Sequence, residues 1–342
     1  MKMRSRCLAL ASLLPLLALA GCGVQKTIHK ADAQADAGDY NQAFGTLQAA
    51  LVQYPKDKAL HRAEIRFLLR AGRIDQAYAY YRRFTQQISP NDAVLYDALR
   101  DKHDEVRSAA AQCLAIGGDP AAVTPLLKAL GDPNDDVRRS ATVSLGDLRQ
   151  TKAVPALIRA LDDHWWNVRA EAAAALGKLR DLRAVTPLFK ALRDPNSTVV
   201  DAAQDALGTL ARVPGADLAP YRAALQSPDA TTMQAAALAL AAAGDASATP
   251  VLVGYLASDD RALRLQALQA LRRSHAPEAV PAARKALADP ELRVRGEAVL
   301  TLLQYKDKES IPALQALADN PQEEPHLRQY VAQAIPGLKA LP

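Results

Sequence analysis

The apolar positions of the chain repeat with a fixed spacing over most of its 342 residues. In segment 132–146, Val137 is followed by Ala141 four positions later and by Leu145 eight positions later. Residues spaced by four and eight lie on one face of an α-helix, and a small Ala on that face lets a neighbouring helix approach closely. The set recurs mostly every 31 residues, with its first member at Val106, Val137, Val168, Val199, Thr232, Leu263 and Val294. The pattern predicts a series of equivalent helices.

Each of these helices has a start signal and a partner helix before it. Segment 132–146 begins with Asp132, which can cap the helix, and with Pro133, which suits its first turn. A short apolar segment, AVTPLLKAL at 122–130, precedes it, and similar segments occupy 153–161 and 184–192. The unit is therefore a helical hairpin of about 31 residues, repeated about eight times over residues 91–342.

These hairpins resemble the short HEAT-like repeats first noted in phycobilin lyases. The resemblance covers about three quarters of the chain. It implies an all-α fold, an α-solenoid in which helical hairpins stack into a superhelix and each repeat contacts its neighbours. It implies no particular activity, because one fold supports many functions.

A different repeat precedes the hairpins. Segments 37–55 and 71–90 match with a separation of 34, from Gly38 to Gly72 and from Ala43 to Ala77. This pattern resembles the tetratricopeptide repeat, although the early Leu-Gly of that family is absent. We expect two such repeats over residues 31–90. Within the second, Arg62 and Arg66 lie one helical turn apart at positions that line the peptide groove in that family. They are candidates for gripping an acidic peptide, and the alternative is a solvated basic stripe.

The first twenty-two residues read as an export signal, with three cations followed by an apolar run too short to span a bilayer. The ending LAGC at 19–22 resembles the lipobox of bacterial lipoproteins. The resemblance implies a signal peptide at 1–21, acylation of Cys22, and a short tether at 22–30. Gly23 stands where lipoproteins kept at the inner membrane often carry Asp, which favours the outer membrane and its periplasmic face.

Removal of the signal changes the meaning of the charge. The formal net charge of +5 falls to +2 when Lys2, Arg4 and Arg6 are removed. Residues 23–90 carry a net charge of +4, and residues 91–342 carry −2. The repeats are therefore not a basic rod, and we expect no nucleic-acid partner. Removal of the signal also takes away Cys7, and acylation occupies Cys22. Cys113 is then the one remaining thiol, so no intrachain disulfide is expected.

Charged residues also follow the repeat. An Arg comes directly after the apolar residue in most repeats, as Arg138 follows Val137. An Asp stands five positions before the apolar residue, as Asp132 does before Val137. We expect each such Arg to reach the Asp of the next repeat and form a ladder of ion pairs along the stack.

Both tryptophans of the chain lie in one turn of the repeat. Segment DHWWNV at 163–168 takes the place of DPNDDV at 132–137, so Trp165 and Trp166 occupy positions that other repeats fill with Asn, Asp or Ser. They are predicted to lie at the start of the second helix of the third hairpin. They either cover the apolar surface of neighbouring turns or stand exposed as an anchor for a partner.

Patterns typical of enzymes are absent from the sequence. The six His are scattered, and no HExxH, GxSxG, CxxC or glycine-rich phosphate loop occurs. We therefore expect no catalytic residue, cofactor or metal, and Cys113 is interpreted as a small core residue. The leading hypothesis is a non-catalytic, lipid-anchored periplasmic scaffold that binds proteins or peptides in a cell-envelope complex. The alternative is an accessory enzyme or cofactor-handling protein related to the HEAT-like lyases.

Overall fold

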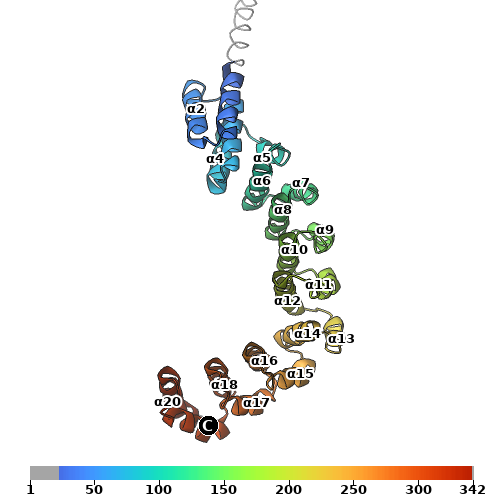
Figure 1. Cartoon of the computed structure of the whole chain (residues 1–342), viewed down its shortest axis with the longest axis vertical. Coiled ribbons are helices and arrows are strands. Elements are labelled where there is room, and N and C mark those ends of the chain that lie inside the picture. Colours follow the sequence, from blue (N-terminus) through green and yellow to red (C-terminus); the bar gives the residue numbers. More distant parts are fainter. Residues whose placement is uncertain (1–22, 341–342) are drawn as a thin grey trace, which may run out of the picture. The chain divides into compact units, whose positions relative to one another are not determined.

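The computed structural model describes residues 23–340, and every regular element in that range is a helix (Figure 1). The predicted all-α solenoid is confirmed. The chain divides into two compact units, one up to Ala175 and one from Leu176 onward, and the division falls inside one helix. Each unit is described by itself.

The first unit opens with two long hairpins. The first joins a helix over residues 23–36 to α2 (Tyr40–Gln53), and the second joins α3 (Lys58–Arg70) to α4 (Ile74–Gln87). Gly38 and Gly72 make the tight turns with φ of 84° and 67°, a backbone conformation that suits residues without a Cβ atom.

The expected tether is wrong for residues 23–30. These residues form the start of the helix over 23–36, and Val24 is only 4 % exposed, in a core that also contains Leu47 and Leu60. Burial of Val24 and Ala31 on the same face stabilises the helix from its beginning. Cys22 and the predicted signal peptide lie outside the described residues.

Shorter hairpins follow in the first unit. They pair α5 (Val94–Ala98) with α6 (Asp104–Gly117), α7 (Val123–Ala129) with α8 (Asp135–Asp147), and α9 (Val154–Ala160) with α10 (Trp166–Leu179). Single turns of 3-10 helix, η1 (Pro120–Ala122) and η2 (Thr151–Ala153), lead into α7 and α9.

The second unit contains five further hairpins. They pair α11 (Val185–Ala191) with α12 (Ser197–Ala211), α13 (Ala219–Ala224) with α14 (Ala230–Ala242), α15 (Thr249–Tyr255) with α16 (Arg261–Arg273), α17 (Ala279–Ala286) with α18 (Leu292–Gln304), and α19 (Ile311–Asp319) with α20 (Pro325–Lys339). Turns η3 (Leu182–Ala184), η4 (Ala246–Ala248) and η5 (Lys308–Ser310) lead into α11, α15 and α19.

The core of each hairpin is built from the periodic positions. Val137, Ala141 and Leu145 are fully buried, as the helical spacing predicts. Cys113 is buried as well, and desolvation raises the pKa of its thiol to about 12, with a smaller contribution from the charge of Asp75. The thiol is therefore protonated at neutral pH, which agrees with the interpretation of Cys113 as a core residue.

The predicted ladder of ion pairs is present in both units. Arg107 binds both carboxylate oxygens of Asp132 at 2.8 Å, and Arg138 binds those of Asp163 at 2.8 and 3.0 Å. In the second unit, Arg264 and Asp289 form the same bidentate pair at 2.8 and 2.9 Å. Further along the same unit, Arg295 binds Glu323 at 2.7 and 2.6 Å.

Each ladder Arg also binds the turn of its own repeat. Nη1 of Arg138 donates to the carbonyl oxygens of Asp132 and Pro133, at 2.9 and 3.2 Å. Burial raises the pKa of Asp163, but the hydrogen bonds from Arg138 and from the Trp165 amide outweigh it, so the net pKa is lowered. One guanidinium therefore fixes two successive turns.

Replacement of Arg138 by Ala should destabilise the first unit by about 3–5 kcal/mol, because it leaves the Asp163 carboxylate largely buried without its cation. The side chain of Arg138 is only 7 % exposed. Urea denaturation followed by tryptophan fluorescence measures the effect. The matched control is Arg139→Ala, since Arg139 is 40 % exposed and makes only a 3.6 Å pair with Asp136. We expect that control to change stability by less than about 1 kcal/mol, and equal losses in the two variants would contradict the ladder's role.

Candidate binding sites

The two tryptophans lie where the register of the repeats predicts. Trp165 is in a bend and Trp166 is the first residue of α10, at positions that the preceding repeat fills with Asn134 and Asp135. Trp165 is 40 % exposed and Trp166 is 36 % exposed. A large part of both indoles therefore reaches solvent, which favours the anchor over full coverage by the neighbouring turns.

The turn that carries the tryptophans is held from both sides. The amide N–H of Trp165 donates to Oδ1 of Asp163 at 2.9 Å, and Asp163 is bound by Arg138 of the preceding repeat. The adjacent His164 is exposed, and its ring lies 3.3 Å from Nη2 of Arg138. Two adjacent aromatic side chains on a fixed turn suit the core of a protein interface, because Trp supplies a large contact area and few rotatable bonds.

Arg62 reaches solvent at the edge of a groove. Its side chain is 46 % exposed, and Nε donates to Asp92 at 3.0 Å. The groove has a volume of about 330 Å³ and lies between the helix over 23–36, α3 and α5. Ile28, Ala59 and Val94 supply apolar atoms to it. Arg62 thus remains a candidate for contacting a peptide or carboxylate in this groove.

Arg66 has a different environment. It donates to Asp32 at 2.5 Å and to both oxygens of Asp101, and its Nη2 lies 3.1 Å from Nδ1 of His103. Burial lowers the pKa of Arg66, but the two carboxylates outweigh this and the net pKa is raised. Arg62 and Arg66 both line the groove, yet the charge of Arg66 is already balanced within the chain.

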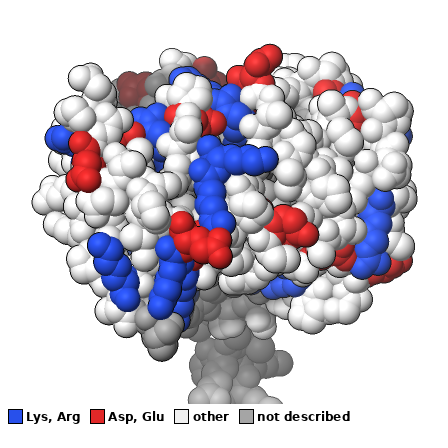
Figure 2. All heavy atoms as spheres, turned by 90° about the horizontal axis from the view of Figure 1, so that it is seen from below, with Lys and Arg blue, Asp and Glu red and all other residues white. Residues whose placement is uncertain are grey.

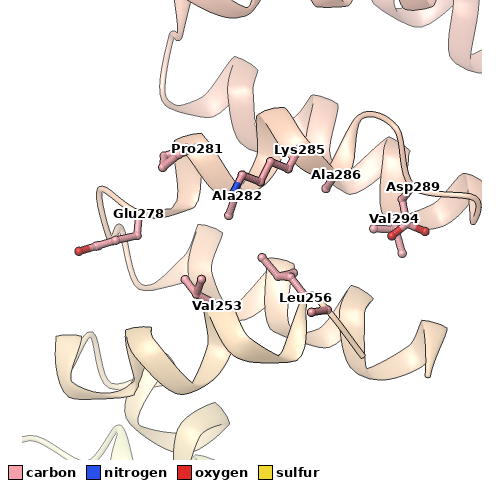
Figure 3. Close-up of a pocket in the computed structure, with 10 residues that line it drawn as sticks. Val253, Leu256, Glu278, Pro281, Ala282, Lys285, Ala286, Asp289 and Val294 are labelled. Carbon is pink, nitrogen blue, oxygen red and sulfur yellow. The ribbon is translucent and has the colours of Figure 1, made fainter. Parts of the chain in front are cut away.

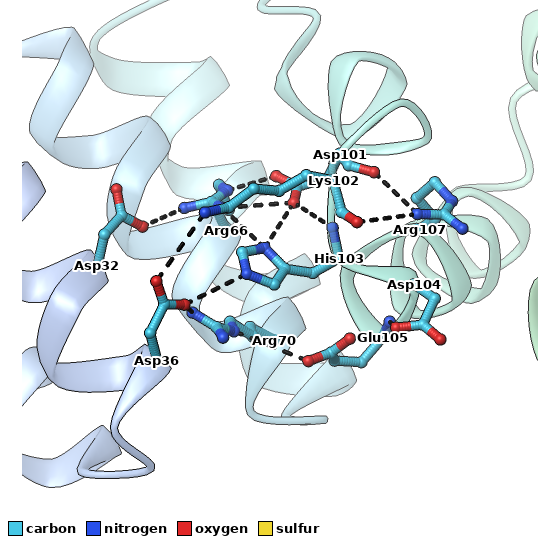
Figure 4. A network of polar contacts seen from close by, with 10 residues as sticks. All are labelled: Asp32, Asp36, Arg66, Arg70, Asp101, Lys102, His103, Asp104, Glu105 and Arg107. Carbon is cyan, nitrogen blue, oxygen red and sulfur yellow. Dashed lines mark hydrogen bonds and ion pairs between the residues drawn. The ribbon is translucent and has the colours of Figure 1, made fainter.

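Arg66 belongs to a network that joins the long hairpins to the ladder (Figure 4). Arg70 lies 2.7 Å from Asp36 and 3.8 Å from Glu105, and the ring of His103 lies between Asp36 at 3.3 Å and Asp101 at 3.0 Å. We call this group the junction network: Asp32, Asp36, Arg66, Arg70, Asp101, His103 and Glu105. Sequence reasoning missed it. The available signal was spacing, because Asp32 and Arg66, like Asp36 and Arg70, are separated by the same 34 residues as Gly38 and Gly72.

Two larger grooves occupy equivalent places in different repeats. One lies between α5 and α7 with a volume of about 500 Å³, and the other lies between α15 and α17 with about 410 Å³. Figure 3 shows the second, in which Val253 and Leu256 face Ala282 and Lys285. These grooves belong to the repeat geometry, since Lys128 in the first matches Lys285 in the second.

Other chemistry in the described residues is limited. Between residues 23 and 340, no three His, Cys, Asp or Glu side chains are placed to hold a metal ion, and no helix there is long and apolar enough to cross a membrane. On the face drawn in Figure 2, Lys and Arg side chains are interspersed with Asp and Glu, and neither sign forms a continuous patch.

Comparison with known protein families matches HEAT repeats at residues 91–146, 123–208 and 255–335, which together cover more than half of the chain. The chain belongs to the HEAT-repeat family. The match falls within the region where the hairpins and the ladder are seen, and it leaves the two long hairpins before residue 91 outside.

Solved structures also resemble this HEAT-repeat protein. The phycocyanin lyase complex from Nostoc is 25 % identical over 72 % of this chain and 93 % of that one, with a TM-score of 0.38. An archaeal HEAT-like repeat protein from Thermococcus onnurineus is 18 % identical over 71 % of this chain and 96 % of that one, with a TM-score of 0.42. Human deoxyhypusine hydroxylase is 22 % identical over 71 % of this chain and 94 % of that one, with a TM-score of 0.30. With TM-scores this low, none of the three assigns an activity or partner to this chain. No curated protein matches the sequence significantly.

The junction network should weaken in acid. The hydrogen bond from Arg70 lowers the pKa of Asp36 below its ordinary value of 3.8. Burial raises the pKa of Asp101, but the hydrogen bonds from Arg66 and from the His103 amide outweigh this effect, so the pKa of Asp101 also lies below 3.8. A carboxyl whose folded pKa is depressed contributes stability above its ordinary pKa, and that contribution is lost as the pH falls through the folded value. Exchange protection of α3 amides, corrected for the intrinsic rate, should therefore fall from about pH 4 downward.

Asp101→Asn tests this assignment. The variant should lose α3 protection already at neutral pH and show a smaller further loss in acid, because one of the responsible carboxylates is gone. Asp97→Asn is the control, since Asp97 is exposed on the neighbouring α5. An unchanged acid dependence in Asp101→Asn would show that other carboxylates control this region.

Proposed function

We propose that this HEAT-repeat protein is a non-catalytic scaffold of the bacterial cell envelope that binds protein or peptide partners. In this proposal, Cys22 carries a lipid anchor in the outer membrane, and the repeats face the periplasm. The lipobox-like residues 19–22 support the anchor, and the repeat architecture supports the binding role because stacked hairpins present extended surfaces.

The observation that carries the binding role is the exposed pair Trp165 and Trp166. The repeat itself does not need them, because the preceding hairpin builds the same turn with Asn134 and Asp135. Contact between apolar indole surface and water is unfavourable in free energy, and burial of that surface against a partner would stabilise the complex. A position that departs from the repeat in size and polarity, on a turn already fixed by Arg138 and Asp163, suits a contact residue.

The groove beside Arg62 supplies a second candidate contact. Its apolar residues and the half-exposed guanidinium suit an extended segment that carries a carboxylate. Arg66 contributes to this proposal only as the residue that fixes α3 beside the neighbouring helices, since Asp32 and Asp101 already bind it.

Replacement of both tryptophans by the residues of the preceding repeat, Trp165→Asn with Trp166→Asp, should abolish partner capture while the repeats stay folded. The preceding repeat builds the same turn with Asn134 and Asp135, so the variant loses only the covered part of indoles that are 40 % and 36 % exposed, and stability should fall by about 1–3 kcal/mol. Crosslinking in the native envelope, with the full-length protein as bait, measures capture, and calorimetry measures stability.

The matched control is Ile116→Gln, which removes another exposed apolar side chain of the same unit. It should capture the same partners as the wild type. Equal capture by the double tryptophan variant would rule out the anchor role, whereas a bound chromophore or metal on the protein isolated from its envelope would favour the accessory-enzyme alternative.

The lipid anchor is tested separately by mass spectrometry of the protein isolated from its native envelope. The expected N-terminal peptide begins at Cys22 and carries covalent acyl chains, because a lipobox places the cleavage directly before the modified Cys. Cys22→Ser should remain uncleaved and unacylated. An N-terminal peptide that begins elsewhere without acyl chains would exclude the anchor.

A further inference from the structure

One end of the two long hairpins carries exposed apolar side chains beside lysines. Val52 at the end of α2 is 82 % exposed, and Tyr54 after it is 41 % exposed. Lys26, Lys56 and Lys58 are exposed in the same part of the chain. We call these five residues the basal surface: Lys26, Val52, Tyr54, Lys56 and Lys58.

The ion pairs show that these residues lie at the same end of the helices. Asp32 pairs with Arg66 and Asp36 with Arg70, so the helix over 23–36 runs parallel to α3 with an offset of 34 residues. That offset places Lys58 level with Val24. The α2 helix runs antiparallel to the helix over 23–36, with Thr46 bound to Gln34 at 2.8 Å, so it ends at the level where the first helix begins.

Two carboxylates near this end are engaged within the chain, whereas Asp97 is exposed and lines the groove beside Arg62. Asp57 caps α3 by accepting from the amides of Ala59 and Leu60 at 2.9 and 3.1 Å. Asp92 is buried and is bound by Arg62. The basal surface therefore presents its lysines without an exposed carboxylate among its own members, which suits an anionic partner.

The beginning of the first helix places this surface close to the predicted anchor. Residues 23–36 are helical and Val24 packs in the core, so only one peptide link, at most about 4 Å of chain, separates Gly23 from Cys22. The polar headgroup region of a bilayer is about 5–7 Å deep on each side. A lipid on Cys22 would thus bring the basal surface into the headgroup layer.

We propose that the basal surface docks on the anionic phospholipid headgroups of the membrane to which the chain is anchored. This proposal rests on the lipid anchor of the proposed function. Tyr54 suits the interface between headgroups and acyl chains, Val52 supplies apolar contact, and the three lysines attract the headgroup phosphates. The anchor then holds the long hairpins upright on the bilayer instead of leaving them on a loose tether.

Binding to vesicles without the acyl chain tests this surface directly. The protein is the chain from residue 22 onward with Cys22→Ser, which keeps every described residue. It should cosediment with vesicles rich in phosphatidylglycerol and much less with vesicles of phosphatidylcholine alone. Changing Lys26, Lys56 and Lys58 to Gln should weaken binding on the order of a hundredfold, since each lysine near an anionic surface contributes a factor of about five.

Two further variants localise the effect. Lys128, Lys152 and Lys339 are exposed elsewhere, so changing these three to Gln alters the net charge equally and should leave binding unchanged. Val52→Ser with Tyr54→Ser should weaken binding to both kinds of vesicle. Equal binding by the basal lysine variant and the wild type, equal loss in the control variant, or no binding of the wild type to either vesicle would each overturn the proposal.

These outcomes are independent of the anchor itself. The mass of the N-terminal peptide reports acylation of Cys22, and the vesicle measurement reports the surface of a chain that lacks the acyl group. A protein that is acylated but fails to bind anionic vesicles keeps its anchor and loses the docking surface. If the protein from the native envelope carries no acyl group but the chain binds anionic vesicles, the docking surface is supported and the lipid anchor is excluded.

Discussion

The bidentate pair between an Arg of one repeat and the carboxylate of the next is the interaction that fixes successive hairpins in both units. In a stack where each repeat touches only its neighbours, every interface must be fixed locally. Arg138 does this with one side chain, because it binds Asp163 ahead and the carbonyl of Asp132 behind. Asp163 in turn accepts the amide of Trp165, so the pair fixes the next turn as well as the spacing between hairpins.

The hairpins and their ladder were predictable because both depend on short-range spacing. Residues four and eight apart share a helix face whatever surrounds the helix, and the Arg beside the core residue meets a similar environment in the repeats that carry it. The start of the first helix was predictable by the same rule and was missed. Val24, Ile28, Ala31 and Ala35 follow the helical spacing and contribute to one core.

Side-chain environments depended on contacts that spacing does not encode. Arg62 and Arg66 look equivalent in the sequence, one helical turn apart and both basic. Arg62 is half exposed, whereas Arg66 meets Asp101, which lies 35 residues further along the chain and in another kind of repeat. The tryptophans show the same limit. Their place in the turn follows from the register of the repeats, but their exposure depends on whether neighbouring side chains cover them.

The candidate contacts of the first unit share one physical property, which is that each lies on backbone already fixed by the fold. The tryptophan turn is held by Arg138 and Asp163, the Arg62 groove by the pairs around Arg66, and the basal surface by the core that begins at Val24. Binding normally costs the free energy of ordering the groups that make contact. A surface whose turns and helix ends are ordered beforehand loses less of that free energy, so a few aromatic and basic side chains suffice for a specific contact. In the proposed function, the departures from the repeat sequence make the contacts, and the regular repeat supplies the rigidity that orders them beforehand.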